Sequence, residues 1–151
     1  MTGLREVVFL GRAWAEAMTP DDGHAIVSIA DAGGAPAALR PGWGAVLRLH
    51  FDDVDPDQAP PGEFEAGLVP MTPAQALQIA RFVHAAAATS TTLVVHCRFG
   101  QSRSPAVAKA VCEHVGLDFP AAFRTHNRFV YRLVRDALAD LSRNAQAITP
   151  R

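Results

Sequence analysis

A cysteine and an arginine in the segment VVHCRFGQSRSP, residues 94–105, indicate nucleophilic chemistry on an anion. Cys97 directly follows an apolar run, and Arg103 lies beyond Gly100, between two serines. The thiolate form of cysteine is a strong nucleophile. The planar guanidinium of arginine binds two oxygens of a phosphate at once. The segment therefore predicts a site in which Cys97 attacks an anionic group that Arg103 holds.

The same segment is predicted to join a strand to a helix. Residues 92–96 form a continuous apolar run, which is typical of a strand buried on both faces of a sheet. Pro105 suits the first turn of the helix that follows, where the missing N–H costs nothing. Gly100 allows a positive φ, so the amides of residues 98–103 can point into one cup. The positive end of the helix favours an anion in that cup.

Strand and helix patterns alternate along the rest of the chain, which predicts an α/β fold with a mostly parallel sheet. Thr72 and Pro73 have the residue types of a helix N-cap and first position. We expect one three-layer domain over residues 1–143, with about four to five strands flanked by helices, and a C-terminal tail over residues 144–151. The further strands are expected at 7–10, 25–29 and 45–51, and the helices at 73–87, 106–115 and 130–141.

Composition limits the classes of partner. The 151 residues carry a formal net charge of −1, whereas nucleic acids and anionic membranes call for a basic excess. The chain has no run of about 18 apolar residues, the length that spans a bilayer, and no apolar signal-peptide core near its start. Two cysteines make no disulfide framework. We therefore expect a cytoplasmic protein with neither nucleic acid nor membrane as its partner.

The run from His96 to Ser104 matches the signature HCxxGxxR, followed by Ser or Thr, and so resembles the cysteine-dependent protein tyrosine phosphatases. The ending Ser102-Arg103-Ser104-Pro105 is most similar to the dual-specificity branch of that superfamily. With less specific motifs, the resemblance extends over about residues 45–142 and includes Asn127. It implies a phosphatase-type catalytic domain that hydrolyses a phosphomonoester through a phosphocysteine intermediate, with neither a metal nor another cofactor.

The resemblance also implies a role for each residue of the segment. Cys97 would be the nucleophile, Arg103 would bind the phosphoryl oxygens, and Ser104 would hydrogen-bond the thiolate and help it leave. His96 would organise the loop, although a plain buried histidine is an equally good interpretation. The residues expected to bind phosphate are Arg98, Phe99, Gly100, Gln101, Ser102 and Arg103.

A general acid is expected in the segment HFDDVDPD, residues 50–57. Resemblance to the acid-bearing loop of the family maps the acid onto Asp53, with Asp52 and Asp55 as the other candidates. The separation between Asp53 and Cys97 is longer than is usual in the family, so this mapping requires an insertion in the Pro-rich stretch 52–71. The alternative is that these aspartates, together with Asp57, simply solvate a turn.

The other polar residues give weaker functional predictions than the cysteine loop does. The histidines show no paired Cys/His or HExxH spacing, so no metal site is assigned. Cys112 is interpreted as a buried core residue and not as a resolving thiol for Cys97, because about nine helical residues beyond Arg103 place it too far away. A basic run near the last helix is interpreted mainly as a solvated face, of which one or two members could favour acidic substrates. That run consists of Arg124, Arg128, Arg132 and Arg135.

Three classes of function remain open. The first is an active phosphatase, the second is a catalytically weak module that binds phosphorylated ligands, and the third is rhodanese-like or arsenate-reductase-like chemistry on a similar loop. The paired Cys97 and Arg103 and the upstream aspartates favour the first. The loop lacks the lysines of phosphoinositide phosphatases, which favours a phosphoprotein substrate, with phosphotyrosine ahead of phosphoserine or phosphothreonine.

Overall fold

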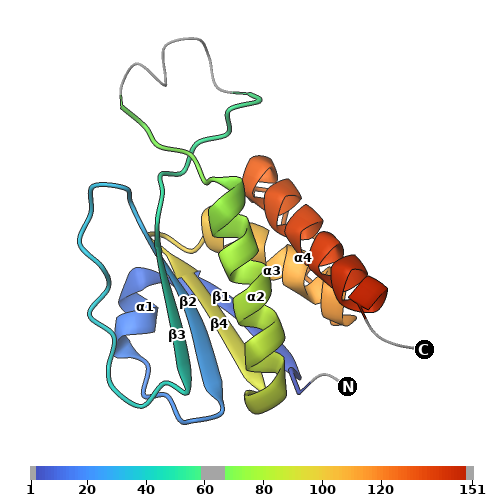
Figure 1. Ribbon diagram of the computed structural model, residues 1–151. Coiled ribbons are helices and arrows are strands. Elements are labelled where there is room, and N and C mark those ends of the chain that lie inside the picture. Colours follow the sequence, from blue (N-terminus) through green and yellow to red (C-terminus); the bar gives the residue numbers. More distant parts are fainter. Residues whose placement is uncertain (1–2, 59–66, 149–151) are drawn as a thin grey trace.

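The chain folds around a four-stranded parallel sheet, which confirms the predicted α/β class (Figure 1). The computed structural model describes residues 3–58 and 67–148, with side chains as far as residue 145. In space the strands follow the order β1-β4-β2-β3. Their bounds are β1 (Glu6–Gly11), β2 (His24–Ala30), β3 (Ala45–His50) and β4 (Thr92–Cys97).

Helices cover both faces of this sheet, so the domain has the three layers that were expected. The short α1 lies on one face, and the three longer helices α2, α3 and α4 lie on the other (Figure 1). The helices are α1 (Arg12–Ala17), α2 (Pro73–Thr89), α3 (Arg103–Val115) and α4 (Arg128–Ile148).

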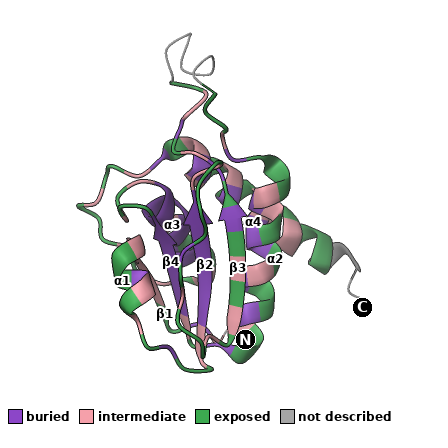
Figure 2. Ribbon diagram, turned by 90° about the vertical axis from the view of Figure 1, so that its left-hand side faces the viewer, coloured by how far each residue is buried: buried purple, intermediate pink, exposed green. Residues whose placement is uncertain are grey.

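The two central strands are buried on both faces, as their continuous apolar sequences predict (Figure 2). Alternate residues of β4 point to opposite faces: Leu93 and Val95 join the large core under α2, α3 and α4, whereas Val94 joins the small core under α1. Cys97 follows Leu93 and Val95 in this alternation and lies in the large core. The strand therefore delivers its cysteine to the face that α3 covers.

The start of α2 is fixed at the carboxyl edge of the sheet. Thr72 and Gln75 form a reciprocal capping box at the start of α2, which confirms the predicted N-cap. The side chain of Gln75 also donates to the His50 carbonyl at 2.9 Å, which attaches α2 to the end of β3.

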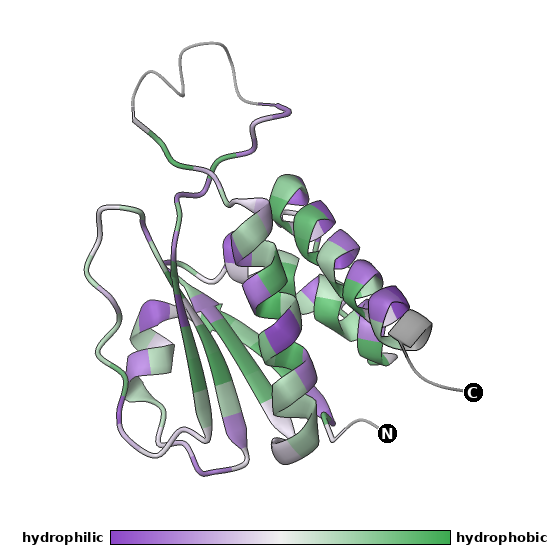
Figure 3. Cartoon of the chain, in the orientation of Figure 1, coloured by the Kyte–Doolittle hydropathy of each residue, from purple (hydrophilic) through white to green (hydrophobic). Residues whose placement is uncertain are grey.

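On α4, an apolar stripe that includes the buried Val130 and Leu138 faces the core, and a polar face is turned outward (Figure 3).

Two segments differ from expectation. The six-residue helix α1 was not predicted, because it is shorter than the window over which helical periodicity can be recognised and buries only Ala15 completely. Helix α4 continues to Ile148, past Asn144, where a tail was expected to begin. The residues after Asn144 include two alanines and a glutamine, which are good helix formers, and the first proline is Pro150.

Parts of two predicted segments lie outside the described residues. They are 59–66 in the Pro-rich stretch and 149–151 at the end of the expected tail. Within the part of the chain that is described, no helix combines the length and the apolar character needed to cross a membrane.

Candidate active site

The predicted cysteine loop lies at the carboxyl edge of the sheet, between two strands whose helices leave on opposite faces. The chain runs from β1 into α1 and from the neighbouring β4 into α3, and ligands of α/β proteins bind at such a divergence (Figure 1). Gly100 has φ +74, and a Cβ atom there would lie 2.5 Å from the Gly11 amide nitrogen. Glycine is therefore required at this position for two reasons: the φ angle is positive, and β1 approaches too closely for a Cβ atom.

Cys97 lies at the floor of the loop and is only 2 % exposed. Its Sγ atom is 3.2 Å from the Ser104 hydroxyl and accepts from the Ser104 amide at 3.4 Å. These contacts come from the first turn of α3, and the N-terminal end of a helix favours an anion. The structure therefore brings together Cys97 and Ser104, the two residues that the resemblance paired.

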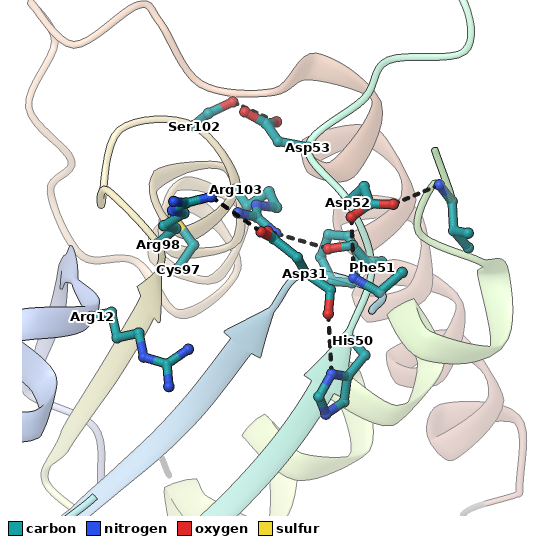
Figure 4. A network of polar contacts seen from close by, with 12 residues as sticks. Arg12, Asp31, His50, Phe51, Asp52, Asp53, Cys97, Arg98, Ser102 and Arg103 are labelled. Atoms are coloured by element: carbon teal, nitrogen blue, oxygen red, sulfur yellow. Dashed lines mark hydrogen bonds and ion pairs between the residues drawn. The ribbon is translucent and has the colours of Figure 1, made fainter. Parts of the chain in front are cut away.

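Arg103 is held rigidly beside this thiol, although a guanidinium is usually exposed. It is 4 % exposed, and its Nη1 donates to the Phe51 carbonyl at 2.8 Å and forms an ion pair with Asp31 at 2.9 Å (Figure 4). Its Nε, also buried, has no hydrogen-bond partner among the described residues. A buried donor without a partner is costly. An anion in the cup would supply the missing acceptor.

Asp31 is a site residue that the sequence analysis missed. Its carboxylate lies between two guanidiniums, 2.9 Å from Arg103 and 3.6 Å from Arg98 (Figure 4). The residue directly follows β2, which is the neighbour of β4 in the sheet. That position was a usable signal, because residues that follow adjacent parallel strands meet at the same edge. We infer that Asp31 is a positioning residue, since it orients Arg103.

Of the four aspartates in residues 50–57, Asp53 is the one that contacts the cysteine loop. Its Oδ1 accepts from the Ser102 hydroxyl at 2.8 Å and from the Asn127 side-chain amide at 2.9 Å. Asn127 in turn donates its backbone N–H to the Ser102 carbonyl at 3.0 Å and accepts from the Val130 amide at 3.0 Å with its side-chain oxygen. Asn127 therefore joins three segments: the Asp53 segment, the cysteine loop and the start of α4.

The other three aspartates of the segment have different partners. The Asp52 carboxylate accepts from the backbone of Ala32 at 3.1 Å and of Val69 at 2.8 Å. Because the Asp52 amide also donates to the Val69 carbonyl at 2.7 Å, the connection between β3 and α2 is closed at its base. Because Asp53 directly follows Asp52, this closure fixes the backbone beside Asp53. Asp55 accepts from the Asp57 amide, and Asp57 forms an ion pair with Arg132.

Three residues of the loop, Arg98, Phe99 and Gln101, are exposed to solvent. Phe99 is 72 % exposed, and the Arg98 guanidinium lies 5.1 Å from the centre of its ring. The Gln101 carbonyl accepts from the Thr125 hydroxyl at 3.2 Å, so this residue too is attached to the segment before α4. Arg98 differs from Phe99 and Gln101 in that its side chain contacts Asp31, the ion-pair partner of Arg103. The binding of phosphate by their amides stays a prediction.

His96 is completely buried on the opposite face of β4 from Cys97. Its Nδ1 is 3.2 Å from the Cys97 carbonyl and its Nε2 is 2.6 Å from the Ser28 hydroxyl. Because a carbonyl only accepts, Nδ1 carries the proton and Nε2 accepts from Ser28. Burial lowers the pKa of His96, which keeps the ring neutral. The ring thus fixes the backbone at Cys97, as the loop-organising interpretation requires.

Neither the second cysteine nor a metal cluster extends this site. Cys112 is a free, buried thiol on α3, and burial raises its pKa, so the unreactive protonated form is favoured. This confirms its interpretation as a core residue. Within residues 3–58 and 67–148, no three His, Cys, Asp or Glu side chains come together as metal ligands would.

Comparison of the chain with protein-family models, with curated proteins and with solved structures finds no match in any of the three. The function is therefore inferred from the geometry of the chain's own residues.

Proposed function

We propose that the protein is a metal-independent phosphomonoester hydrolase that acts through a phosphocysteine intermediate, most similar to protein tyrosine and dual-specificity phosphatases. One observation carries the proposal: the buried Arg103 holds an unpartnered Nε beside a buried thiol at the start of α3. A phosphoryl group would satisfy this donor and the helix end together, and it would place phosphorus within reach of Cys97.

In the first step, the Cys97 thiolate attacks phosphorus and the bond from phosphorus to the ester oxygen breaks. Asp53, attached to the loop through Ser102, gives its proton to the departing oxygen. In the second step, water attacks the phosphocysteine, its proton passes to Asp53, and the S–P bond breaks. The Ser104 hydroxyl, 3.2 Å from Sγ, donates to the leaving thiolate. Arg103 stabilises the charge on the phosphoryl oxygens in both steps.

The position of Asp53 favours this function over the two alternatives. A rhodanese-like or arsenate-reducing enzyme has no ester oxygen to protonate, and a module that only binds phosphorylated ligands needs no acid at all. We propose a phosphoprotein as the substrate, with phosphotyrosine as the first candidate. The cytoplasm is the proposed location, because Cys97 and Cys112 are both free thiols and the cytoplasm keeps such thiols reduced.

The first experiment is an assay of p-nitrophenyl phosphate hydrolysis by the purified protein. We expect turnover that EDTA leaves unchanged and that vanadate, a phosphate analogue, inhibits. Thiosulfate and arsenate are assayed in parallel and are expected to give no comparable turnover. Loss of activity with EDTA would contradict the metal-independent mechanism, and efficient thiosulfate or arsenate turnover without ester hydrolysis would favour the third class of function.

Replacing Asp53 by asparagine is expected to reduce hydrolysis of esters with poor leaving groups by about 10²- to 10⁴-fold, the usual contribution of a general acid. The loss should be small for p-nitrophenyl phosphate, since p-nitrophenolate leaves without being protonated. The decline in rate at alkaline pH should also flatten, because that decline reports ionisation of the acid. Steady-state rates over a series of leaving groups and pH values measure both effects.

Asp55→Asn and Asp52→Asn are the matched controls. Asp55 hydrogen-bonds within its own turn, and Asp52 binds the backbone of Ala32 and Val69. Neither substitution should change the dependence on the leaving group, although Asp52→Asn is expected to lower the thermal stability. If one of these two variants shows the leaving-group effect and Asp53→Asn does not, the general acid is that residue.

A further inference from the structure

A groove lies between α3 and α4, and the segment that forms one of its walls contacts the cysteine loop. This α3–α4 groove has a volume of about 700 Å³. It is lined by Lys109 and Glu113 of α3, by the segment 117–126, and by Arg128, Tyr131, Arg132 and Arg135 of α4. We propose that it binds an acidic polypeptide segment next to the phosphorylated residue of the substrate. This inference rests on the proposed phosphatase function and specifies its substrate.

The charge of the groove carries the inference. Its lining includes five cationic side chains, four arginines and Lys109, against the two carboxylates of Glu113 and Asp118. The chain as a whole has a formal net charge of −1, so this positive charge is local. Arg124 and Arg128 are exposed and form no ion pair among the described residues. Carboxylates of a bound peptide would complement these two guanidiniums.

The same two arginines lie at the catalytic end of the groove. Between them in the chain, the Thr125 hydroxyl donates to the Gln101 carbonyl and the Asn127 amide donates to the Ser102 carbonyl. Residues 124–128 therefore border the loop that would hold the phosphate. A polypeptide whose phosphorylated side chain enters the cup would pass over this border into the groove.

The walls of the groove are already formed, which limits the entropy lost on binding. Phe119 and Phe123 pack against Phe9 of β1, with ring centroids 5.5 and 5.0 Å away. Lys109 Nζ and the Arg135 guanidinium lie over the Tyr131 ring, at 4.8 and 5.6 Å from its centre. These aromatic rings are thus engaged within the protein. That arrangement disfavours nucleic acid, whose single strands bind by stacking bases on open rings.

The test uses two phosphotyrosine peptides that differ only in their flanking residues, glutamate in one and glutamine in the other. The ratio of their kcat/KM values measures selectivity and cancels any general change in catalysis. Wild type is expected to prefer the acidic peptide, and Arg124→Glu/Arg128→Glu should lower the ratio by about tenfold, since each exposed ion pair contributes little by itself. Added salt should reduce the wild-type preference, because exposed charges are screened.

Arg81→Glu is the matched control, since Arg81 is exposed on α2 and does not line the groove. The groove inference is overturned if wild type does not distinguish the peptides, or if Arg81→Glu lowers the ratio as much as the double variant does. Fluorescence polarisation measures the binding of both peptides to the Cys97→Ser protein. This measurement tests the groove inference without turnover. Absence of p-nitrophenyl phosphate hydrolysis by wild type contradicts the phosphatase function separately.

Two competing ligands complete the binding experiment. A single-stranded oligonucleotide and vesicles that contain phosphatidylserine are titrated against the same protein. Weak binding of both, unaffected by Arg124→Glu/Arg128→Glu, supports the peptide assignment. Tighter binding of either one than of the acidic peptide, lost in the double variant, would assign the groove to that ligand and overturn the inference.

Discussion

Replacing Cys97 by serine is expected to reduce phosphate ester hydrolysis by roughly 10⁴- to 10⁶-fold, the scale on which loss of a nucleophile acts in covalent catalysis. Serine has a similar size, so the contacts with Ser104 can be kept. Its hydroxyl, however, remains protonated at neutral pH, and the segment offers no adjacent base to activate it: His96 points to the other face of β4, toward Ser28. Single-turnover kinetics measure this loss.

Cys112→Ser is the control for the loss of a buried thiol. Cys112 lies on α3 and is as buried as Cys97, but burial raises the pKa of its thiol. We expect this variant to keep the catalytic rate while unfolding at a lower temperature, because an additional polar group is buried. Hydrolysis by Cys97→Ser at close to the wild-type rate would show that another residue is the nucleophile.

Replacing Arg103 by lysine is expected to reduce kcat/KM by about 10³-fold or more, comparable to the contribution of arginines that stabilise phosphoryl transfer. Lysine keeps the positive charge but has one terminal nitrogen. It cannot hold the Phe51 carbonyl and Asp31 while also donating from a second position to the phosphoryl oxygens. Affinity for vanadate should fall in parallel, because the same donors bind this analogue.

Arg98→Lys is the matched control, because it replaces the other guanidinium that contacts Asp31. The Arg98 side chain is 64 % exposed and contacts the same Asp31, so it shares the electrostatic environment of Arg103 without its burial. Only a small change in kcat/KM is expected. Circular dichroism of the Arg103→Lys protein shows whether it is folded, which distinguishes unfolding from a loss of activity at the site. A folded Arg103→Lys protein that keeps wild-type activity would contradict the assigned role.

The fold could be predicted because burial leaves strong periodic signals in this chain. Residues 93–95 are uniformly apolar since β4 is covered on both faces, and Thr72 with Pro73 marks the start of α2. These signals are absent from α1, which has only six residues. They are weak at the end of α4, where only the helix-forming residue types indicate that the helix continues. Helix ends depend on small free-energy differences and are accordingly harder to predict.

The site was predictable where its residues are close in sequence. The loop from Cys97 to Ser104 is a local feature, and Gly100 has the positive φ that its position requires. Asp31 was missed because its partnership with Arg103 is produced by the sheet, which aligns the ends of β2 and β4. The choice of Asp53 from four nearby aspartates depended on resemblance, and only the contacts with Ser102 and Asn127 distinguish it physically.

The most direct test of the central claim is to trap the covalent intermediate. Wild-type protein is mixed with p-nitrophenyl phosphate, stopped with acid within a turnover, digested and analysed by mass spectrometry. A phosphoryl group is expected on the peptide that carries Cys97, and none on the same peptide from Cys97→Ser protein or on the peptide with Cys112 after the two are resolved. Rapid hydrolysis with no phosphoryl group on Cys97, or with the group on another residue, would contradict the proposed mechanism.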